Sequence, residues 1–475
     1  MDFGQFIIMR QEVLLTLAAI VILIAEIATS DKNKASIIPF ALGLFAVITA
    51  IGFIPGQAGT LFGGSYQSSQ LTMFMKNVLN IAVLIVFFQA ESWLKKEENL
   101  DKVSEYFILT ISTLIGMNFM ISSGDFLTFY LGLETATIPI AGLAAFDKYK
   151  SQSAEAGIKL ILSSALSSGI LLFGLSMIYG ATGSIYFADV AAKVAPTPLI
   201  ALGFVFFVAG MGFKISLVPF HFWTADVYEG APINVTSYLS VVSKGAAAFI
   251  FSIVLFTVFK SIVTLWQPLI YTIAVITMTL ANLFALRQNN IKRFLAFSSI
   301  AQAGFILLGV LGAGELGMTS IVYFVLVYVF TNLGAFGVVS AIYDASGVET
   351  ISGYNGLYKT NPKLSLLMTL SLFSLAGIPP VAGFFGKFFL FTAAAGSGYY
   401  ILVLIAVLNA TISLYYYLKV VKAMFIDQND QPIPTFRSSN AMRIALIACI
   451  AGVFVIGFAS GIFEYIRSIS QLFLN

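Results

Sequence analysis

The 475-residue sequence is poor in charge, with 10% charged residues against 59% hydrophobic ones. Soluble globular proteins carry about 25% charged residues, so this composition excludes that class. Cysteine is nearly absent: Cys449 stands alone, so the chain can form no internal disulfide and has neither a CxxC motif nor a Cys/His cluster. We therefore expect no iron–sulfur cluster, zinc or other metal site. The basic residues are scattered, which argues against a nucleic-acid partner.

Long apolar runs dominate the chain instead. About fourteen of them are long enough to cross a bilayer as helices, and the first has no signal-peptide cleavage site, so we expect it to be retained. The connections between them are too short for an extramembrane domain. The sequence thus predicts an all-α integral membrane protein, with spans near 13–29, 37–55, 75–93, 104–122, 126–146, 157–180, 198–221, 232–259, 267–286, 294–313, 318–342, 364–396, 400–425 and 441–463.

The distribution of lysine and arginine predicts the orientation of these spans. Cytoplasmic loops are enriched in basic residues, and with the N-terminus outside, fifteen basic residues lie in the inner loops and flanks and five in the outer ones. The inner set is Lys32, Lys34, Lys95, Lys96, Lys102, Lys148, Lys150, Arg287, Lys292, Arg293, Lys359, Lys363, Lys422, Arg437 and Arg443. The outer set is Arg10, Lys76, Lys193, Lys260 and Arg467. We therefore expect both termini in the periplasm and a multi-pass protein of a bacterial inner membrane.

Five lysines fall inside the predicted spans: Lys159, Lys214, Lys244, Lys387 and Lys419. A charge at the bilayer centre costs roughly 2.5–3.5 kcal/mol, so such residues usually face the bundle interior and serve a transport path. The alternative is snorkelling to the headgroups, which we favour for Lys419 near the end of its span and leave open for Lys159. Glu134 is the corresponding deep carboxylate. Burial lowers the pKa of a lysine, which makes it a proton carrier where arginine would stay charged.

Two spans are interrupted close to these lysines. Pro219 follows Lys214 by five residues, and the Gly377-Ile378-Pro379-Pro380 tract precedes Lys387 by seven. A broken helix leaves backbone groups unpaired, which is tolerated only inside protein or beside water. Breaks five spans apart predict two inverted five-helix repeats, as in many secondary transporters. The alternative, that the prolines only kink helices for packing, explains less well why both breaks sit beside a lysine.

The predicted organisation has four parts. Residues 1–100 form a three-helix segment, 101–262 the first repeat, 263–426 the second, inverted repeat, and 427–475 the last helix. His221, the only histidine, lies at the first break. It can relay a proton near neutral pH or simply bind a freed carbonyl.

The tracts that carry these residues resemble the antiporter-like subunits of respiratory complex I. Within that family the chain most resembles the N-type members, because Ser243-Lys244 stands where other types carry histidine, Lys387 stands where one of them carries glutamate, and no long lateral helix is present. The resemblance is dense from about residue 100 to 425. The matching tracts are Tyr130–Glu134, Lys159–Leu162, Tyr179–Gly183, Gly212–Trp223, Asp226–Pro232 and Ser374–Phe388.

The resemblance implies roles for individual residues. Glu134 and Lys214 form a charge pair at the start of a half-channel, with Lys159 beside it. Lys244 lies centrally and Lys387 in the exit half-channel. Gln302 stands where many relatives have histidine, so water or hydroxyl groups must bridge that link. Ala225 replaces a usual proline, a change that we expect to be mild.

The function implied is proton translocation coupled to quinone reduction in other subunits. The chain would belong to a proton-translocating NADH:quinone oxidoreductase without doing redox chemistry itself, since it has no dinucleotide fingerprint. NADH, FMN, iron–sulfur clusters and quinone are expected in partner subunits; the partners are other membrane subunits, including related antiporter-like ones, and lipids. Two alternatives stay open: a subunit of a multisubunit cation/proton antiporter, and a scaffold whose lysines only bind neighbours or lipids.

Overall fold

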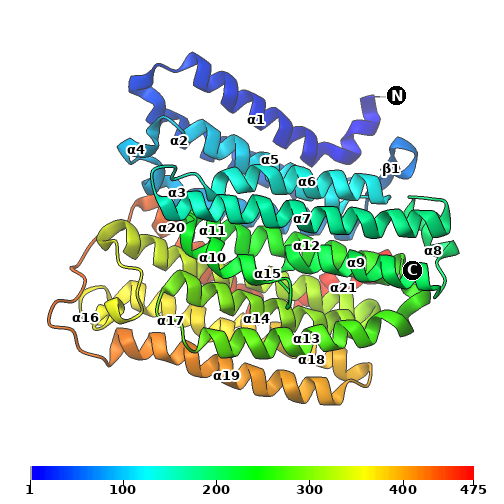
Figure 1. Cartoon of the computed structure of the whole chain (residues 1–475). Coiled ribbons are helices and arrows are strands. Elements are labelled where there is room, and N and C mark those ends of the chain that lie inside the picture. The colour runs from blue at the N-terminus through cyan, green and yellow to red at the C-terminus, as the bar shows by residue number, and fades with distance from the viewer. Residues whose placement is uncertain (1–2, 475) are drawn as a thin grey trace.

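A computed structural model describes residues 3–474, most of them in helices that run roughly side by side (Figure 1). The helix that opens the chain and the one that closes it both approach the end of the bundle where β1 lies. We call this the β1 end, and the opposite one, where α4 (Glu97–Leu100) lies, the α4 end.

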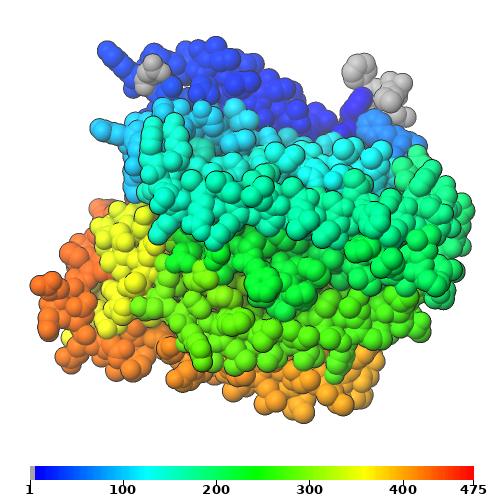
Figure 2. Space-filling view, viewed as in Figure 1, coloured from blue at the N-terminus to red at the C-terminus, as the bar shows by residue number. Residues whose placement is uncertain are grey.

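The first helices form one flank of the bundle. They are α1 (Arg10–Ala28), α2 (Ile37–Gly52) and α3 (Gln70–Leu94). A short antiparallel hairpin of β1 (Gly59–Leu61) and β2 (Tyr66–Ser68) joins the last two, with Gly59 opposite Ser68. In the space-filling view this blue flank and the orange α19 (Tyr400–Phe425) lie at opposite edges of the molecule (Figure 2).

The remaining helices follow in chain order. The first group is α5 (Val103–Ile121), α6 (Phe126–Ala144), α7 (Ser151–Thr182), α8 (Phe187–Lys193), α9 (Pro198–Ile215), α10 (Phe222–Gly230), α11 (Ile233–Tyr238) and α12 (Lys244–Thr257). The second is α13 (Val263–Ala285), α14 (Ile291–Gly312), α15 (Gly314–Ser346), α16 (Leu357–Thr360), α17 (Pro362–Ala376), α18 (Ala382–Gly396), α20 (Asn440–Phe458) and α21 (Ser460–Leu474). Short 3-10 helices lie at Phe3–Met9, Asp31–Ser36, Phe62–Gly64, Lys260–Ile262 and Ser352–Tyr354, and a π-helical turn at Leu239–Ser243.

The expected number of membrane crossings is confirmed. Within residues 3–474, thirteen helices are long and apolar enough to span a membrane. The shorter apolar helices α17 and α18 follow one another along the bundle and make one further, broken crossing (Figure 1). The chain is thus an all-α, multi-pass membrane protein.

Three crossings form the centre of the bundle. The α11–α12 segment and α14 are enclosed entirely by other helices, and α15 almost entirely. In contrast, α1 and α19 leave most of their surface open to the surrounding lipid. Enclosure keeps polar side chains out of hydrocarbon, so the central crossings are where such side chains can be accommodated.

Both predicted helix breaks are present. Helix α9 ends at Ile215 and α10 begins at Phe222, so Pro219 lies in the gap. Helix α17 ends with Gly377 in the left-handed region at φ 88°, a conformation that glycine adopts without strain, and the turn through Pro379 and Pro380 leads into α18. The start of α18 packs so tightly on α17 that a Cβ added at Gly383 would lie 1.7 Å from the Ser374 carbonyl oxygen.

Some expectations were wrong at the helix ends. The span predicted over 198–221 stops at Ile215 because the chain turns before the proline. Helix α3 begins at Gln70, so Lys76, expected at the outer flank of its span, lies inside the helix. The residue is 1% exposed, and its Nζ lies 2.5 Å from Glu12 Oε1. Glu134 is therefore not the only deep carboxylate.

Candidate functional site

Lys214 lies at the last turn of α9 and is buried. Its Nζ donates to Thr137 Oγ1 of α6 at 2.7 Å, while the Thr137 hydroxyl donates to the Leu133 carbonyl at 2.6 Å. Glu134 is one helical turn before Thr137 on the same face, and its buried Oε1 has no hydrogen-bond partner. Glu134 and Lys214 form no direct ion pair in this structure. The two groups of the expected charge pair are therefore separated.

The residue that ends α9 adopts an unusual backbone conformation. Ser216 has φ 68° and ψ 41°, the left-handed region that a non-glycine residue rarely adopts, and its fully buried hydroxyl has no hydrogen-bond partner. Such strain clusters at functional sites, where surrounding structure enforces it. Here it lies two residues from Lys214.

His221 and Trp223 follow in the same break. The Trp223 Nε1–H donates to the Phe213 carbonyl at 3.0 Å, which satisfies a backbone acceptor at the end of α9. His221 is buried, its ring lies 4.6 Å from that of Phe222, and its Nδ1 has no partner. The imidazole is thus placed at the break with one ring nitrogen free to bind a water molecule.

Lys244 opens α12 at the centre of the bundle, directly after the π-helical turn. Its Nζ donates to Ser299 Oγ of α14 at 2.5 Å and lies 5.3 Å from the centre of the Tyr228 ring. No carboxylate forms an ion pair with it among the described residues. The sequence did not predict the π turn, although such turns in α-helices occur frequently at functional sites.

Gln302 lies one turn after Ser299 on α14 and joins a hydroxyl cluster. Its Nε2 donates to the Leu375 carbonyl at 3.0 Å and to the Tyr417 hydroxyl at 3.3 Å, and that hydroxyl lies 2.5 Å from Ser298 Oγ. Two hydroxyl groups, of Tyr417 and Ser298, therefore lie at or next to the Gln302 amide. They can pass a proton by exchanging donor and acceptor roles, which the amide does not do.

Lys387 lies beyond Gln302, in α18. Its Nζ donates to the Ala376 carbonyl at 2.9 Å, the last carbonyl of the broken α17, and lies 4.6 Å from the centre of the Phe305 ring. A cavity of about 10 Å³, at the lower limit for one water molecule, is lined by both Gln302 and Lys387. The helix break thus supplies the acceptor for this lysine.

Lys159 is placed differently from the interior lysines. Its side chain is 42% exposed, and its Nζ lies 2.7 Å from both Glu155 and Asp226. Asp226 also binds Arg293 at 2.7 Å, and Arg293 binds Glu229 at 2.9 Å. Lys159 therefore belongs to a charge network between α7, α10 and α14, and makes no direct contact with Glu134 or Lys214.

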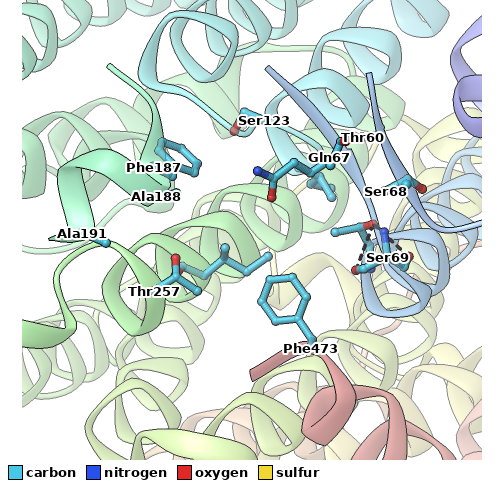
Figure 3. Close-up of a pocket in the computed structure, with 14 residues that line it drawn as sticks. Thr60, Gln67, Ser68, Ser69, Ser123, Phe187, Ala188, Ala191, Thr257 and Phe473 are labelled. Carbon is cyan, nitrogen blue, oxygen red and sulfur yellow. Dashed lines mark hydrogen bonds between the residues drawn. The ribbon is translucent and has the colours of Figure 1, made fainter. Parts of the chain in front are cut away.

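A hollow of about 410 Å³, lined by both apolar and polar side chains, opens at the β1 end (Figure 3). Hydroxyl and amide groups line it, among them those of Thr60, Gln67, Ser123 and Thr257, and no lining residue is charged. Thr257 lies thirteen residues after Lys244 on α12, about 20 Å along the helix. Water can enter the bundle from this end, but a buried stretch separates it from the central lysine.

Three predicted lysines are buried on α9, α12 and α18, each bound to a hydroxyl or carbonyl oxygen rather than a carboxylate. Sequence reasoning missed these partners, Thr137 and Ser299, because single hydroxyl residues are common in any helix. Their helical spacing from Glu134 and Gln302 was the available signal. Within residues 3–474 no group of three or more His, Cys, Asp or Glu side chains is arranged to hold a metal ion.

Comparison with known proteins places this geometry in a family. Residues 123–413 match the family described as NADH:quinone oxidoreductase/Mrp antiporter, transmembrane. The chain is 51% identical over 473 residues to NADH-quinone oxidoreductase subunit N of Phocaeicola vulgatus, covering 99% of this chain and 100% of that one. It is 38% identical to the subunit N of Desulforamulus reducens over 482 residues, covering 100% of both chains.

Solved structures show the same fold. A chain of respiratory complex I from Thermus thermophilus superposes with a TM-score of 0.78 at 25% identity, covering 95% of this chain and 97% of that one. A chain of the Mrp complex from Dietzia superposes with a TM-score of 0.85 at 20% identity, covering 100% and 98%. Together with the identity over the full length, these matches show that the chain belongs to the N-subunit family of the NADH-quinone oxidoreductases.

Proposed function

We propose that this chain carries protons across a bacterial inner membrane as a membrane-arm subunit of respiratory complex I, driven by quinone reduction in other subunits. One observation carries the proposal: Lys214, Lys244 and Lys387 are all buried inside the bundle, each bound to a neutral oxygen. A buried ammonium without a carboxylate partner loses its proton more readily than an ion-paired one, so these lysines suit transfer rather than permanent charge.

The proposed path starts at Glu134 and Lys214. When the carboxylate and the ammonium are close, their attraction of about 4 kcal/mol at 4 Å and an effective dielectric of 20 holds the lysine protonated. In the separated arrangement seen here Lys214 rests on Thr137 and is ready to release its proton. The proton then passes through His221 or water to Lys244, and through the Ser298–Tyr417–Gln302 cluster to Lys387. Lys159 lies on the entry side and acts through its ion pairs.

The remaining assignments follow from complex I. NADH, FMN, iron–sulfur clusters and quinone are held by partner subunits, and the neighbours in the membrane are other subunits, including related antiporter-like ones, together with lipids. The positive-inside bias places the α4 end in the cytoplasm and both termini in the periplasm. The four-part organisation, with repeats over 101–262 and 263–426, belongs to the same proposal.

The proton path is tested in the complete complex reconstituted in vesicles. Glu134→Gln and Lys214→Met should each lower the number of protons moved per quinone reduced. The double variant should be barely worse than either single one, because both changes disable the same element. Lys419→Met is the matched control: this lysine is exposed and donates to the Leu286 carbonyl, so its loss should leave pumping unchanged. Normal pumping by assembled Lys214→Met complex would contradict the proposal.

Orientation and class are tested separately. A cysteine introduced in the loop over 95–102 should be reached by an impermeant thiol reagent only from the cytoplasmic side. The second candidate, a subunit of a multisubunit cation/proton antiporter, is favoured by the fold shared with the Mrp chain. Sodium-driven proton flux without quinone reduction would support that candidate against complex I.

A further inference from the structure

A polar seam joins α11 and α15 between the α4 end and Lys244. On the α11 side Asn234, Ser237 and Ser240 are buried at helical spacing, and Lys244 follows one turn later. Facing them, α15 carries side chains spaced by four residues: Tyr328, Asn332, Phe336, Ser340 and Asp344. Residues four apart are adjacent on the helix surface, but each step turns about 40° further, so the α15 stripe winds slowly around the helix. It meets the α11 stripe at Asn332 and Ser340, about 12 Å apart along the helix.

Hydrogen bonds connect the two stripes. Asn332 Nδ2 donates to Ser240 Oγ at 2.9 Å, and Ser340 Oγ donates to Asn234 Oδ1 at 3.5 Å. All four side chains are at most 2% exposed. Polar groups inside a membrane bundle are costly, so a row of them along one interface indicates that the interface serves a purpose beyond packing.

Several polar atoms in the seam have no protein partner. Asn332 Oδ1 and the Tyr328 hydroxyl are buried and make no hydrogen bond of ordinary geometry, although the Tyr328 hydroxyl lies close to both Asn332 and Ser299. The Tyr228 hydroxyl, which also lies close to Ser299, makes no hydrogen bond of ordinary geometry either. Buried polar atoms of this kind are normally satisfied by ordered water. Water in these positions would reach Ser299, the partner of Lys244.

The seam opens at the α4 end into a charged pocket of about 40 Å³, room for two or three water molecules. Asn234, Ser340 and Asp344 of the seam line it, next to Lys292. The pocket carries paired charges of both signs. Its ion pairs are Lys292–Glu349 at 2.8 Å, Lys150–Asp147 at 2.9 Å and Lys96–Asp344 at 2.9 Å.

We propose that this seam is a second proton entrance, which leads from the pocket beside Lys292 through Asn234, Asn332 and Tyr328 to Lys244 without passing Lys214. Phe336 is the apolar member of the α15 stripe and is fully buried, so it forms the hydrophobic constriction of the passage. Protons cannot pass it when no water molecules lie beside it. The π-helical turn at Leu239–Ser243 lies beside the seam and gives α11 the freedom to shift there. The inference rests on the proposed function, because it supplies protons to the same central lysine.

Water access to the seam is tested with cysteines in the complete complex, in a Cys449→Ala background. Ser340→Cys lies in the seam, and Ser320→Cys is the matched control: both are buried serines of α15, about 30 Å apart. The probe is 2-aminoethyl methanethiosulfonate, a small water-soluble cation, added from the α4 side, and labelling of this chain is read by mass spectrometry. We expect label at position 340 and none at position 320. An unlabelled Ser340→Cys chain would overturn the proposed passage.

Proton pumping supplies the second measurement. Asn332→Leu keeps the side-chain volume and removes its polar atoms. In complex that carries Lys214→Met, adding Asn332→Leu should remove what remains of this chain's contribution to pumping, because both entrances are then closed. Where Asn332→Leu fails to assemble, Ser240→Ala combined with Ser340→Ala removes the hydroxyls instead. Unchanged pumping in these combinations would overturn the second entrance.

A further variant separates this inference from the proposed function. Lys244→Met lies beyond both entrances, so it should abolish the contribution of this chain to pumping. Loss with Lys244→Met but none with the seam variants would refute the entrance alone. Normal pumping with Lys244→Met would refute the proposed function together with the entrance.

Discussion

Thr137 is expected to control whether Lys214 can leave Glu134. The hydroxyl uses its hydrogen on the Leu133 carbonyl and therefore presents a lone pair to the Lys214 ammonium at 2.7 Å. Valine has nearly the same shape but cannot accept a hydrogen bond. Thr137→Val should thus remove the hydrogen-bond acceptor of Lys214 while leaving the packing of α6 and α9 almost unchanged.

The size of the effect follows from the kind of hydrogen bond lost. A hydrogen bond to a charged group contributes about 1.5–3 kcal/mol, and each 1.36 kcal/mol changes an equilibrium tenfold. The separated, protonated state should therefore become roughly 10- to 150-fold less populated relative to the pair with Glu134 or to the neutral lysine. Either shift slows proton release, so fewer protons should move per quinone reduced.

The assay is proton uptake by vesicles that contain the assembled complex, with quinone reduction measured on the same sample. Thr135→Val is the control, because Thr135 is exposed on the same helix. The combination of Thr137→Val with Lys214→Met should be no worse than Lys214→Met alone. A Thr137→Val complex that pumps as the parent does would refute the idea that this hydroxyl holds the released lysine.

Three further outcomes are expected. Lys76→Met should lower the free energy of unfolding in detergent by about 3–5 kcal/mol, because it leaves the buried Glu12 carboxylate without its partner. The double variant Glu12→Leu with Lys76→Met should be nearly as stable as the parent. Thermal unfolding checks this, and an equal loss of stability in the two variants would contradict it. Lys387→Met and Lys387→Arg should both lower pumping, since a guanidinium keeps its proton, and normal pumping by the arginine variant would show that only charge is needed. Gln302→Leu should lower pumping by breaking the bonds to Tyr417 and Leu375, while Gln302→His should retain it, both read as protons per quinone.

Much of this protein was determined by its sequence alone. Fourteen crossings, two broken helices and the buried lysines follow from apolar run length, from proline and glycine in those runs, and from the cost of charge in hydrocarbon. These are local rules, because each depends only on what a short segment exposes to lipid. The same rules put Lys76 at the outer flank of its span and miss its burial, because its partner Glu12 lies 64 residues away in the sequence.

Tertiary structure alone decided how the lysines are bound. Thr137 and Ser299 lie 77 and 55 residues from the lysines that they bind, so the spans of those lysines did not identify them as partners. The Ala376 carbonyl is only 11 residues from Lys387, across the helix break. Tertiary structure also separated Lys159 from the interior lysines, since the carboxylates of α7 and α10 hold its ammonium at the surface. The physical reason is that a span's composition decides whether it enters the membrane, whereas the facing helix decides which of its polar atoms are satisfied and which remain free to bind water or a proton.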